Sequence, residues 1–331
     1  MTNSVPRPET IQRLGAAPFP AFAMLAGMQL ELFTPLGAGA MTAEQLAKVL
    51  GVGEAKLTPL LYALASAGLL TVDNGRFANT LEADRYLVRG KPTYLGDRHL
   101  AYTARYHEAA QTAATIRTGQ PQAKRDYASL STEEFDDFLR QLHPSSRAAG
   151  RDLLTRFDFS GYRNMVDVAG GSGGLALAIA TACPQIRVTV IDLPSVMSIT
   201  RRFIEEESMT GRVDAVAGDV VRDPLPGRYD VAVLRSVIQV LPPDDARRLL
   251  HNLIQALEPG APVFLIGQVL DDSRLSPPET VAFNLVFINQ HDGQAYIEKE
   301  YRTWLTEAGF TSIERIPFSG GSSLITARKP A

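Results

Sequence analysis

The amino-acid sequence predicts an α/β fold, with a seven-stranded, mostly parallel sheet flanked by helices and a small helical domain before it. Three observations support this prediction. A glycine-rich turn joins a buried strand to a helix near residue 170, apolar strands alternate with helical segments after it, and a helix–helix–hairpin pattern precedes residue 80. A C-terminal antiparallel hairpin is expected from strands over residues 311–318 and 323–328. With 331 residues, the chain is long enough for more than one domain.

The N-terminal segment is expected to form a winged helix. Thr42 and Gln45 have the spacing of a capping box at the start of a helix over residues 43–50. A second helix over residues 54–67 follows, and residues 69–79 alternate about an Asp-Asn-Gly turn that favours a hairpin. Helix, helix and hairpin in this order are typical of a winged helix.

Such domains often bind DNA, but the composition argues against a nucleic-acid partner here. The helix in the recognition position has Lys56 as its only basic residue, and the whole chain has a formal net charge of −3.

The most apolar stretch, residues 19–33, is too short and too interrupted to span a bilayer, so we expect a buried helix and no membrane partner. With one cysteine and no secretion signal over residues 1–9, the protein is expected to be cytoplasmic.

Residues 99–150 are expected to form a helical linker and substrate lid. Aromatic and imidazole side chains fall at one-turn spacing on two helices of this segment, so each helix can direct such groups into one cavity. The residues expected at this cavity are Tyr102, Tyr106, His107, Leu142 and His143. Side chains at helical spacing are more often part of the core, and this alternative stays open for each of them.

The segment Val-Asp-Val-Ala-Gly-Gly-Ser-Gly-Gly at residues 166–174 carries the clearest functional signal. It leads from a buried strand through a glycine turn into an apolar helix, which is the arrangement of a nucleotide-type cofactor site. Asp167, Gly170, Gly171 and Gly173 are therefore candidate cofactor residues. Residues 171–176, Gly-Ser-Gly-Gly-Leu-Ala, also satisfy the dinucleotide fingerprint, so the motif alone does not separate a nicotinamide or flavin cofactor from S-adenosylmethionine. A glycine turn that only relieves crowding is the structural alternative.

Polar residues after the next three predicted strands favour S-adenosylmethionine. Asp192 is placed to accept hydrogen bonds from both ribose hydroxyls, which indicates a cofactor that carries a ribose. Asp219 and Val220 suit an adenine, with the acid toward the exocyclic amine and the valine against the ring. Arg235 and Ser236 follow the fourth strand at the same edge of the sheet, where ligands bind in open α/β folds.

In order and spacing, these motifs resemble class I methyltransferases, and nearly the whole chain resembles the family of plant caffeate and bacterial natural-product O-methyltransferases. Further segments that carry the resemblance are Phe157-Asp158-Phe159-Ser160-Gly161-Tyr162, Asp192-Leu193-Pro194 and Glu307-Ala308-Gly309-Phe310. The resemblance implies a Rossmann-like class I sheet and S-adenosylmethionine as cofactor, with S-adenosylhomocysteine as product. It also implies a small-molecule acceptor.

The same resemblance assigns domains and further site residues. It implies a winged-helix domain over residues 1–98 that makes an intertwined homodimer, the lid over residues 99–150 and the cofactor domain over residues 151–331. It places the segment of Leu142 and His143 near the sulfur of the methyl donor and the acceptor. Leu193 joins the cofactor candidates, and the acceptor pocket gains Phe283, Asn284 and Phe287.

The sequence departs from this family at the catalytic position. The family normally has a histidine after the fourth strand that acts as general base on an acceptor hydroxyl, whereas this chain has Gln239. An amide does not take up a proton near neutral pH, but it can orient a substrate by hydrogen bonds. The supporting acid of the family matches Asp271 or Asp272 here. We therefore expect Gln239 to align the acceptor, which favours C- or N-methylation, or attack by an oxygen that is already ionised.

Histidines elsewhere are candidates for the missing base or for a metal. His291, in a His-Asp-Gly loop, is the best spare base, and His143 is a second candidate for the catalytic centre. His291 and Asp292 with His143 or His107 could also hold iron or zinc. Because such a loop is more often a solvated turn, we expect no metal.

The leading prediction is S-adenosylmethionine-dependent methyl transfer to a small, aromatic or polyketide-like acceptor of secondary metabolism. Two alternatives stay open. One is a lyase, hydroxylase or cyclase that uses the sulfonium as a positive electrostatic element without transferring its methyl group. The other is a ligand-sensing regulator built on the winged helix, which the lack of a basic recognition surface disfavours.

Overall fold

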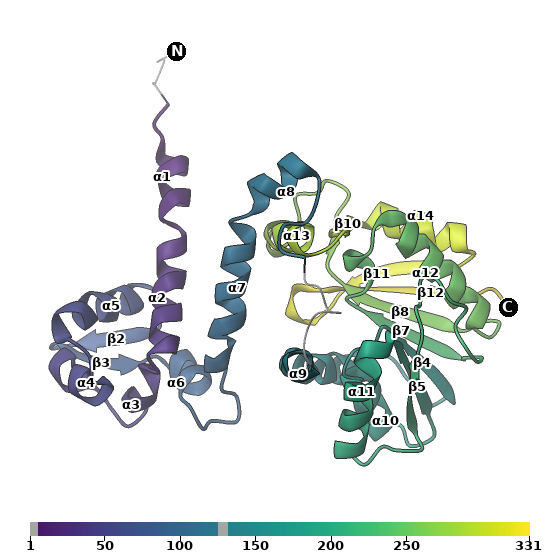
Figure 1. Cartoon of the computed structure of the whole chain (residues 1–331), viewed down its shortest axis with the longest axis horizontal. Coiled ribbons are helices and arrows are strands. Elements are labelled where there is room, and N and C mark those ends of the chain that lie inside the picture. Colours follow the sequence, from purple (N-terminus) through teal and green to yellow (C-terminus); the bar gives the residue numbers. More distant parts are fainter. Residues whose placement is uncertain (1–5, 125–131) are drawn as a thin grey trace. The chain divides into compact units, whose positions relative to one another are not determined.

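The computed structural model describes residues 6–124 and 132–331 (Figure 1). The chain divides into two compact units, Met1–His107 and Glu108–Ala331. Part of the expected lid, residues 125–131, lies outside the described residues. No helix in the described part of the chain has the length and apolar character needed to cross a membrane.

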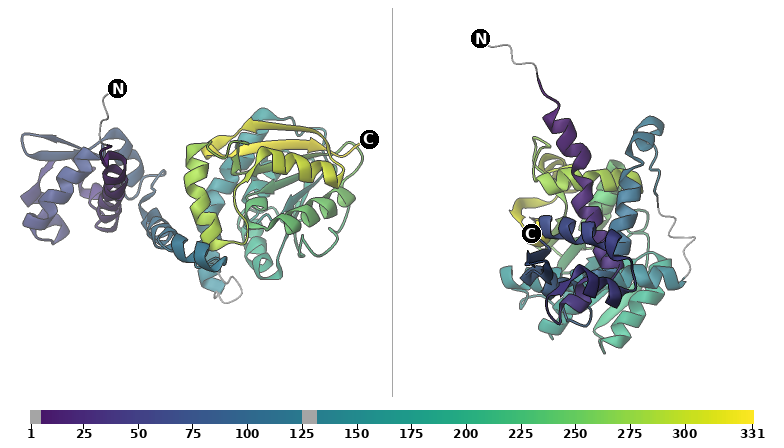
Figure 2. Two further views of the ribbon diagram at one scale, coloured as in Figure 1. Left: turned by 90° about the horizontal axis from the view of Figure 1, so that it is seen from above. Right: turned by 90° about the vertical axis from the view of Figure 1, so that its left-hand side faces the viewer.

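The N-terminal unit begins with two successive helices, α1 (Glu9–Ala16) and α2 (Pro18–Gln29). Helix α1 extends beyond the rest of its unit and buries none of its residues (Figures 1 and 2). Its apolar side chains are exposed, and so are those at the start of α2. These exposed residues are Ile11, Leu14, Phe19 and Phe22. The unit therefore presents an apolar helical surface that its described elements leave largely uncovered.

The remainder of the N-terminal unit is the predicted winged helix. Its elements are α3 (Phe33–Leu36), β1 (Met41–Thr42), α4 (Ala43–Leu50), α5 (Glu54–Ser66), β2 (Leu70–Asp73), β3 (Arg76–Asn79) and α6 (Leu81–Leu87). The strands form an antiparallel sheet in the order β1-β3-β2. The capping box expected for α4 is confirmed, because the Gln45 N–H donates to Thr42 Oγ1 at 3.2 Å and the Thr42 N–H donates to Gln45 Oε1 at 3.0 Å. Helix α7 (His99–Ala109) follows and crosses the boundary between the units.

The C-terminal unit alternates strands and helices. Its helices are α8 (Thr112–Thr118), α9 (Thr132–Arg156), α10 (Gly174–Ala182), α11 (Pro194–Glu206), α12 (Pro243–Ala256), α13 (Pro278–Gln290) and α14 (Glu298–Ala308). Its strands are β4 (Asn164–Val168), β5 (Arg187–Asp192), β6 (Val213–Ala217), β7 (Val231–Arg235), β8 (Pro262–Gly267), β9 (Val269–Leu270), β10 (Tyr296–Ile297), β11 (Thr311–Pro317) and β12 (Ser323–Arg328). Strands β9 and β10 form a short parallel pair of their own.

The main sheet has seven strands in the order β11-β12-β8-β7-β4-β5-β6, as predicted. The strands from β8 to β6 run parallel, and β12 and β11 are antiparallel, which confirms the C-terminal hairpin. The chain moves outward from β4 to β5 and β6, and then returns to β7 and β8 on the other side of β4. The winding direction therefore reverses between β4 and β7, and ligands of open α/β sheets bind beyond the carboxyl ends of the strands at such a point.

Helices cover both faces of this sheet (Figure 1). Alternate side chains of β7 show the two layers, because successive residues of a strand point to opposite faces. Val231 and Val233 pack in one core with residues of α9, α10 and α11, whereas Ala232 and Leu234 pack in another with residues of α12 and α14. Burial on both faces explains why the parallel strands are apolar almost throughout.

Candidate active site

Two non-glycine residues with a left-handed backbone mark the reversal point of the sheet. Ala169 follows β4 with a φ of 55°, and Ser236 follows β7 with a φ of 60°. This conformation is unfavourable for a residue with a Cβ, and it is found mainly where the surrounding structure fixes a functional turn. The Ser236 N–H donates to the carbonyl of Ile266 in β8 at 2.8 Å, which holds the second turn in place.

The glycine turn lies close against the sheet. At Gly170, an added Cβ would lie 2.7 Å from Val190 Cγ1 and 2.8 Å from Asp167 Cγ. Gly171 and Gly173 have φ values of 56° and 69°, which favour glycine. Any side chain at position 170 would therefore displace the turn from the strand ends.

Asp167, at the end of β4, is 1% exposed, and neither of its side-chain oxygens has a hydrogen-bond partner among the described residues. Burial raises the pKa of its carboxyl to about 7, and the charge of Asp192 adds to this rise. The Ala176 N–H, which does not meet hydrogen-bond geometry, and the Arg235 guanidinium both oppose it. Buried carboxylates are normally paired or hydrogen-bonded. Asp167 is therefore suited to a ligand that brings a cation or a hydrogen-bond donor.

Asp192 is held rigidly at the end of β5. Its Oδ2 accepts the Gly171 N–H and its Oδ1 accepts the Leu193 N–H, both at 2.8 Å. Burial raises the pKa of this carboxyl, and the two backbone hydrogen bonds oppose the shift. Each oxygen keeps a second lone pair for a ligand hydroxyl. Leu193 beside it is half-exposed and offers an apolar surface.

The two residues after β6 that were expected to contact the cofactor already have partners within the fold. Asp219 Oδ1 accepts the N–H groups of Val221 and Arg222 at 3.0 and 3.2 Å, so this carboxylate caps its own turn. Val220 is buried in the same core as Ile191. Their contacts with an adenine stay a prediction.

Arg235, at the end of β7, is partly buried, and burial lowers the pKa of its guanidinium, whereas the charge of Asp167 raises it. Its Nη2 donates to Ser145 Oγ of α9 at 3.3 Å. Arg235 therefore connects α9 to the strand ends that carry the acids.

Helix α9 also brings Leu142 and His143 to the structure around the glycine turn. Leu142 is 39% exposed. His143 is buried, with its ring stacked on Phe203 of α11 and its Nδ1 2.9 Å from Ser172 Oγ. Its other nitrogen, Nε2, lies 3.1 Å from Glu207 Oε1. Both imidazole nitrogens therefore have partners within the fold.

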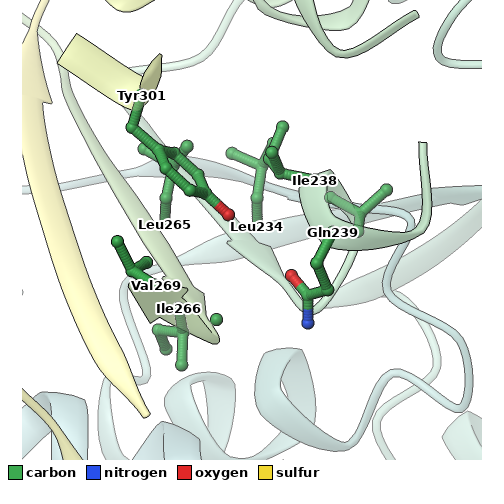
Figure 3. A pocket seen from close by; sticks show the side chains of 9 residues that line it. Leu234, Ile238, Gln239, Leu265, Ile266, Val269 and Tyr301 are labelled. Carbon is green, nitrogen blue, oxygen red and sulfur yellow. The ribbon is translucent and has the colours of Figure 1, made fainter. Parts of the chain in front are cut away.

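Gln239 lies on the 3-10 turn Ile238–Val240 after β7 and is 2% exposed. Figure 3 shows the side chains of Gln239 and Tyr301. Both line a small cavity of about 10 Å³. This space is about that of one water molecule, so it is not the acceptor pocket. The residue that faces Gln239 from β8 is Gly267, where a Cβ would lie 2.8 Å from Gln239 Oε1. Neither position carries an ionisable group.

The two acids expected to support the catalytic position have different partners: Asp271 bonds within its own loop, and Asp272 bonds to the first turn of α14. Asp271 Oδ1 accepts the Ser273 hydroxyl at 2.7 Å, and Asp272 Oδ1 accepts the Lys299 N–H at 3.0 Å.

The loop that carries His291 packs against the Gln239 turn. At Gly293, a Cβ would lie 2.5 Å from the Gln239 carbonyl oxygen and 2.6 Å from that of Leu241. The Tyr296 hydroxyl donates to the same Leu241 carbonyl at 2.6 Å. The structure therefore brings together the two segments that carry Gln239 and His291.

Helix α13, where the acceptor residues were expected, precedes the His291 loop and supports it. The rings of Phe283 and Phe287 meet edge to face at 5.1 Å. Asn284 Oδ1 accepts the Ala295 N–H at 2.7 Å, so this side chain supports the His291 loop.

The residues considered for a metal have other partners or lie apart. Asp292 pairs with Lys124 at 2.5 Å. Among the described residues, no three His, Cys, Asp or Glu side chains are grouped as a metal would require.

Three expected pocket residues belong to the N-terminal unit. Tyr102 packs against the core of that unit, and the Tyr106 ring meets Phe22 edge to face at 5.3 Å. His107 is the last residue of the unit. Their place in an acceptor pocket stays a prediction.

Sequence reasoning missed Ser172, Glu207, Gly267 and Gly293. Ser172 is part of the glycine motif, but the partner of its hydroxyl is His143, which lies 29 residues earlier in the chain. The two glycines are explained by close contacts with Gln239 and Leu241, which only the folded chain reveals. A glycine that ends the apolar strand β8 was the one signal available in the sequence.

A reversing parallel sheet, a glycine turn and acids at two adjacent strand ends define a class I enzyme that binds a nucleoside-bearing cofactor. The chain belongs to the O-methyltransferase family: residues 113–311 match the model of the O-methyltransferase domain. It is an S-adenosylmethionine-dependent methyltransferase.

Named relatives agree with this assignment. The chain is 30% identical over 304 residues to 3-hydroxy-5-methyl-1-naphthoate 3-O-methyltransferase of Streptomyces sahachiroi, covering 89% of this chain and 87% of that protein. It is 29% identical to the N,N-dimethyltransferase OxyT of Streptomyces rimosus, with 98% of each chain covered. The apo structure of the S-adenosylmethionine-dependent methyltransferase SibL has a TM-score of 0.81 and 27% identity, covering 98% of this chain and all of that one.

The residues present fit the donor. S-adenosylmethionine has an ammonium group, a ribose and a carboxylate. The site has a buried carboxylate with no partner among the described residues and an acid fixed by two backbone N–H groups. It also has a partly buried arginine.

Proposed function

We propose that this enzyme methylates a small aromatic or polyketide-like acceptor at carbon, at nitrogen, or at an oxygen that is already ionised. The observation that carries the proposal is the pair Gln239 and Gly267, which face each other without an ionisable group. The naphthoate and OxyT relatives support an acceptor of the natural-product class. One is named as an O-methyltransferase and the other as an N,N-dimethyltransferase, so relatives of this fold include both outcomes.

The donor site is assigned from the strand ends. When bound, S-adenosylmethionine supplies a methyl group activated by its sulfonium. Asp192 would hold the ribose hydroxyls, and Asp167 with Arg235 would hold the charged amino-acid end of the donor. Asp219, Val220 and Leu193 would border the adenine. The glycine turn, at Gly170, Gly171 and Gly173, allows the backbone to approach the donor closely.

Gln239 orients the acceptor in this proposal. Its buried amide offers one acceptor oxygen and two donor hydrogens, and it has no proton-accepting group at neutral pH. Holding two reactants in line can account for 7–11 kcal/mol of a barrier, roughly, in well-aligned systems. An acceptor that needs no deprotonation can therefore be methylated by alignment alone.

O-methylation of a neutral hydroxyl is the second candidate, with His291 as base. The observation that favours it is the close contact between Gly293 and the Gln239 turn, which brings the His291 loop to this end of the sheet. A lyase, hydroxylase or cyclase is not favoured, because the named relatives are methyltransferases. A regulator is not favoured either.

We also infer a homodimer made by the N-terminal unit. Its support is the uncovered apolar surface of α1 and α2. Burying this surface against a second copy of the chain would remove several large apolar side chains from water, which favours association.

Product analysis tests the proposed reaction. The enzyme is incubated with donor labelled at the methyl carbon and with matched aromatic acceptors that differ in one group: a phenol of high pKa, an acidic phenol, an amine and an electron-rich ring carbon. We expect label on nitrogen, carbon or the acidic phenol, located by NMR. Efficient labelling of the neutral, high-pKa phenol alone would contradict the leading proposal and favour the second.

A further inference from the structure

The buried histidine of α9 connects three helices around the glycine turn. His143 stacks on Phe203 with ring centroids 4.3 Å apart and an interplanar angle of 7°. Its Nδ1 lies 2.9 Å from Ser172 Oγ, in the middle of the glycine turn, and its Nε2 lies 3.1 Å from Glu207 Oε1, just beyond α11. The ring is therefore held by contacts at both of its nitrogens and by stacking on its face.

The partners define the protonation state of this ring. Burial lowers the pKa of His143, and the Arg147 guanidinium lowers it further. A neutral imidazole has one N–H, and the Glu207 carboxylate only accepts hydrogen bonds. The proton therefore sits on Nε2 and points to Glu207, while Nδ1 accepts the Ser172 hydroxyl. Arg147 binds the other oxygen of Glu207, so the carboxylate is itself held in place.

A second contact from α9 completes the support of the same turn. Ser146, one helical turn after His143, accepts the Leu175 N–H at its Oγ, at 3.1 Å. The N-cap residue of α10 is Gly173, which has no side chain to supply this cap. At Gly174 an added Cβ would lie 3.0 Å from both the His143 carbonyl oxygen and Ser146 Cβ. Helix α9 thus replaces the missing cap of α10 and leaves no space between the two.

We propose that His143 is a positioning residue for the methyl donor: it fixes the Ser172 hydroxyl and with it the glycine turn, and it exchanges no proton with the acceptor. The proposal rests on the glycine turn being the donor site proposed above. An imidazole whose acceptor nitrogen is used by Ser172 and whose N–H is used by Glu207 has no lone pair left for a substrate. Its removal should therefore weaken donor binding, with the acceptor chemistry changed only in consequence.

Calorimetric titration with S-adenosylhomocysteine tests this without any turnover. His143→Leu keeps the apolar bulk and removes both hydrogen bonds, and we expect about tenfold weaker binding, the size of one to two lost hydrogen bonds. His143→Asn places an amide oxygen near the position of Nδ1 and should restore affinity to within about threefold. His251→Leu, on the exposed surface of α12, is the matched control and should bind as the wild type does.

A double-mutant cycle separates positioning through Ser172 from a general loss of packing. Ser172→Ala should weaken binding as His143→Leu does, and the double variant should show no further loss, because both remove the same contact. Additive losses, or unchanged affinity of His143→Leu, would overturn the proposal. If the wild type itself failed to bind S-adenosylhomocysteine, the donor site would be wrong instead.

A kinetic measurement covers the case in which His143→Leu does not fold. In Ser172→Ala, we expect a higher KM for the donor, and in His143→Asn a donor KM within about threefold of the wild type. Both variants should keep the pH dependence of kcat. Loss of a limb of the kcat profile in His143→Asn, with an unchanged donor KM, would make His143 the general base and contradict the proposal.

Discussion

Asp167 is a carboxylate that the folded chain holds in an unfavourable setting. Burial raises its pKa from 3.8 to about 7, so between these values the folded state keeps a proton that the unfolded state has lost. The stability contributed by this group is therefore complete below about pH 4 and is lost as the pH rises through 7. A cationic ligand group bound beside the ionised Asp167 carboxylate would offset this loss of stability.

Asp167→Asn should reveal this cost in the absence of ligand. We expect the variant to exceed the wild type in free energy of unfolding at pH 8, by on the order of 4 kcal/mol, and to have little advantage at pH 4. Urea unfolding at the two pH values measures the difference. The same variant should bind S-adenosylhomocysteine more weakly. A stability difference of equal size at both pH values would contradict the raised pKa.

Asp192, fixed by two backbone N–H groups, is expected to carry much of the affinity for the ribose. Asp192→Ala should weaken binding of S-adenosylhomocysteine by roughly 2–4 kcal/mol, because two charge-assisted hydrogen bonds to the ribose are lost. Titration calorimetry is the measurement. Asp214→Ala, at an exposed position of β6, is the control and should leave the affinity unchanged. Equal affinity of Asp192→Ala and the wild type would remove the ribose assignment.

At the scale of elements, signals that are local in the chain predicted the structure well. The capping box of α4, the hairpin of β2 and β3 and the strand–turn–helix of β4 and α10 depend on residues a few positions apart, and all are present. Contacts between distant segments could not be predicted in this way. Helical spacing placed His143 on one face of α9, but that it meets Glu207, 64 residues later, follows only from tertiary packing.

Gly293 offers a test of how two elements depend on one close approach. Gly293→Ala would push a Cβ into the carbonyls of the Gln239 turn, so we expect a loss of roughly 1–3 kcal/mol in stability and a lower kcat. Gly161→Ala, where an added Cβ meets nothing within 4 Å, is the matched control. Thermal unfolding and a turnover assay measure both variants. Identical behaviour of the two would mean that the His291 loop and the Gln239 turn are not coupled.

The whole molecule is expected to be a homodimer. Specific obligate interfaces usually bury more than roughly 2,000 Å², and the exposed apolar residues of α1 and α2 would supply part of this area. Leu14→Glu with Phe19→Glu should convert the dimer to monomers by light scattering, whereas Leu81→Glu, at a still more exposed leucine of α6, should not. A wild type that is monomeric at micromolar concentration, folded and active, would disprove this.

If Gln239 aligns the acceptor in a site without a catalytic base, the pH dependence of kcat should show no ionisation of an enzyme base. For the wild type, we predict a profile that follows only the ionisation of the acceptor. Gln239→Ala should lower kcat by up to about 100-fold through misalignment and keep the same profile. A wild-type profile with an enzyme base near about pH 6 to 7, lost in His291→Ala, would contradict this role of Gln239.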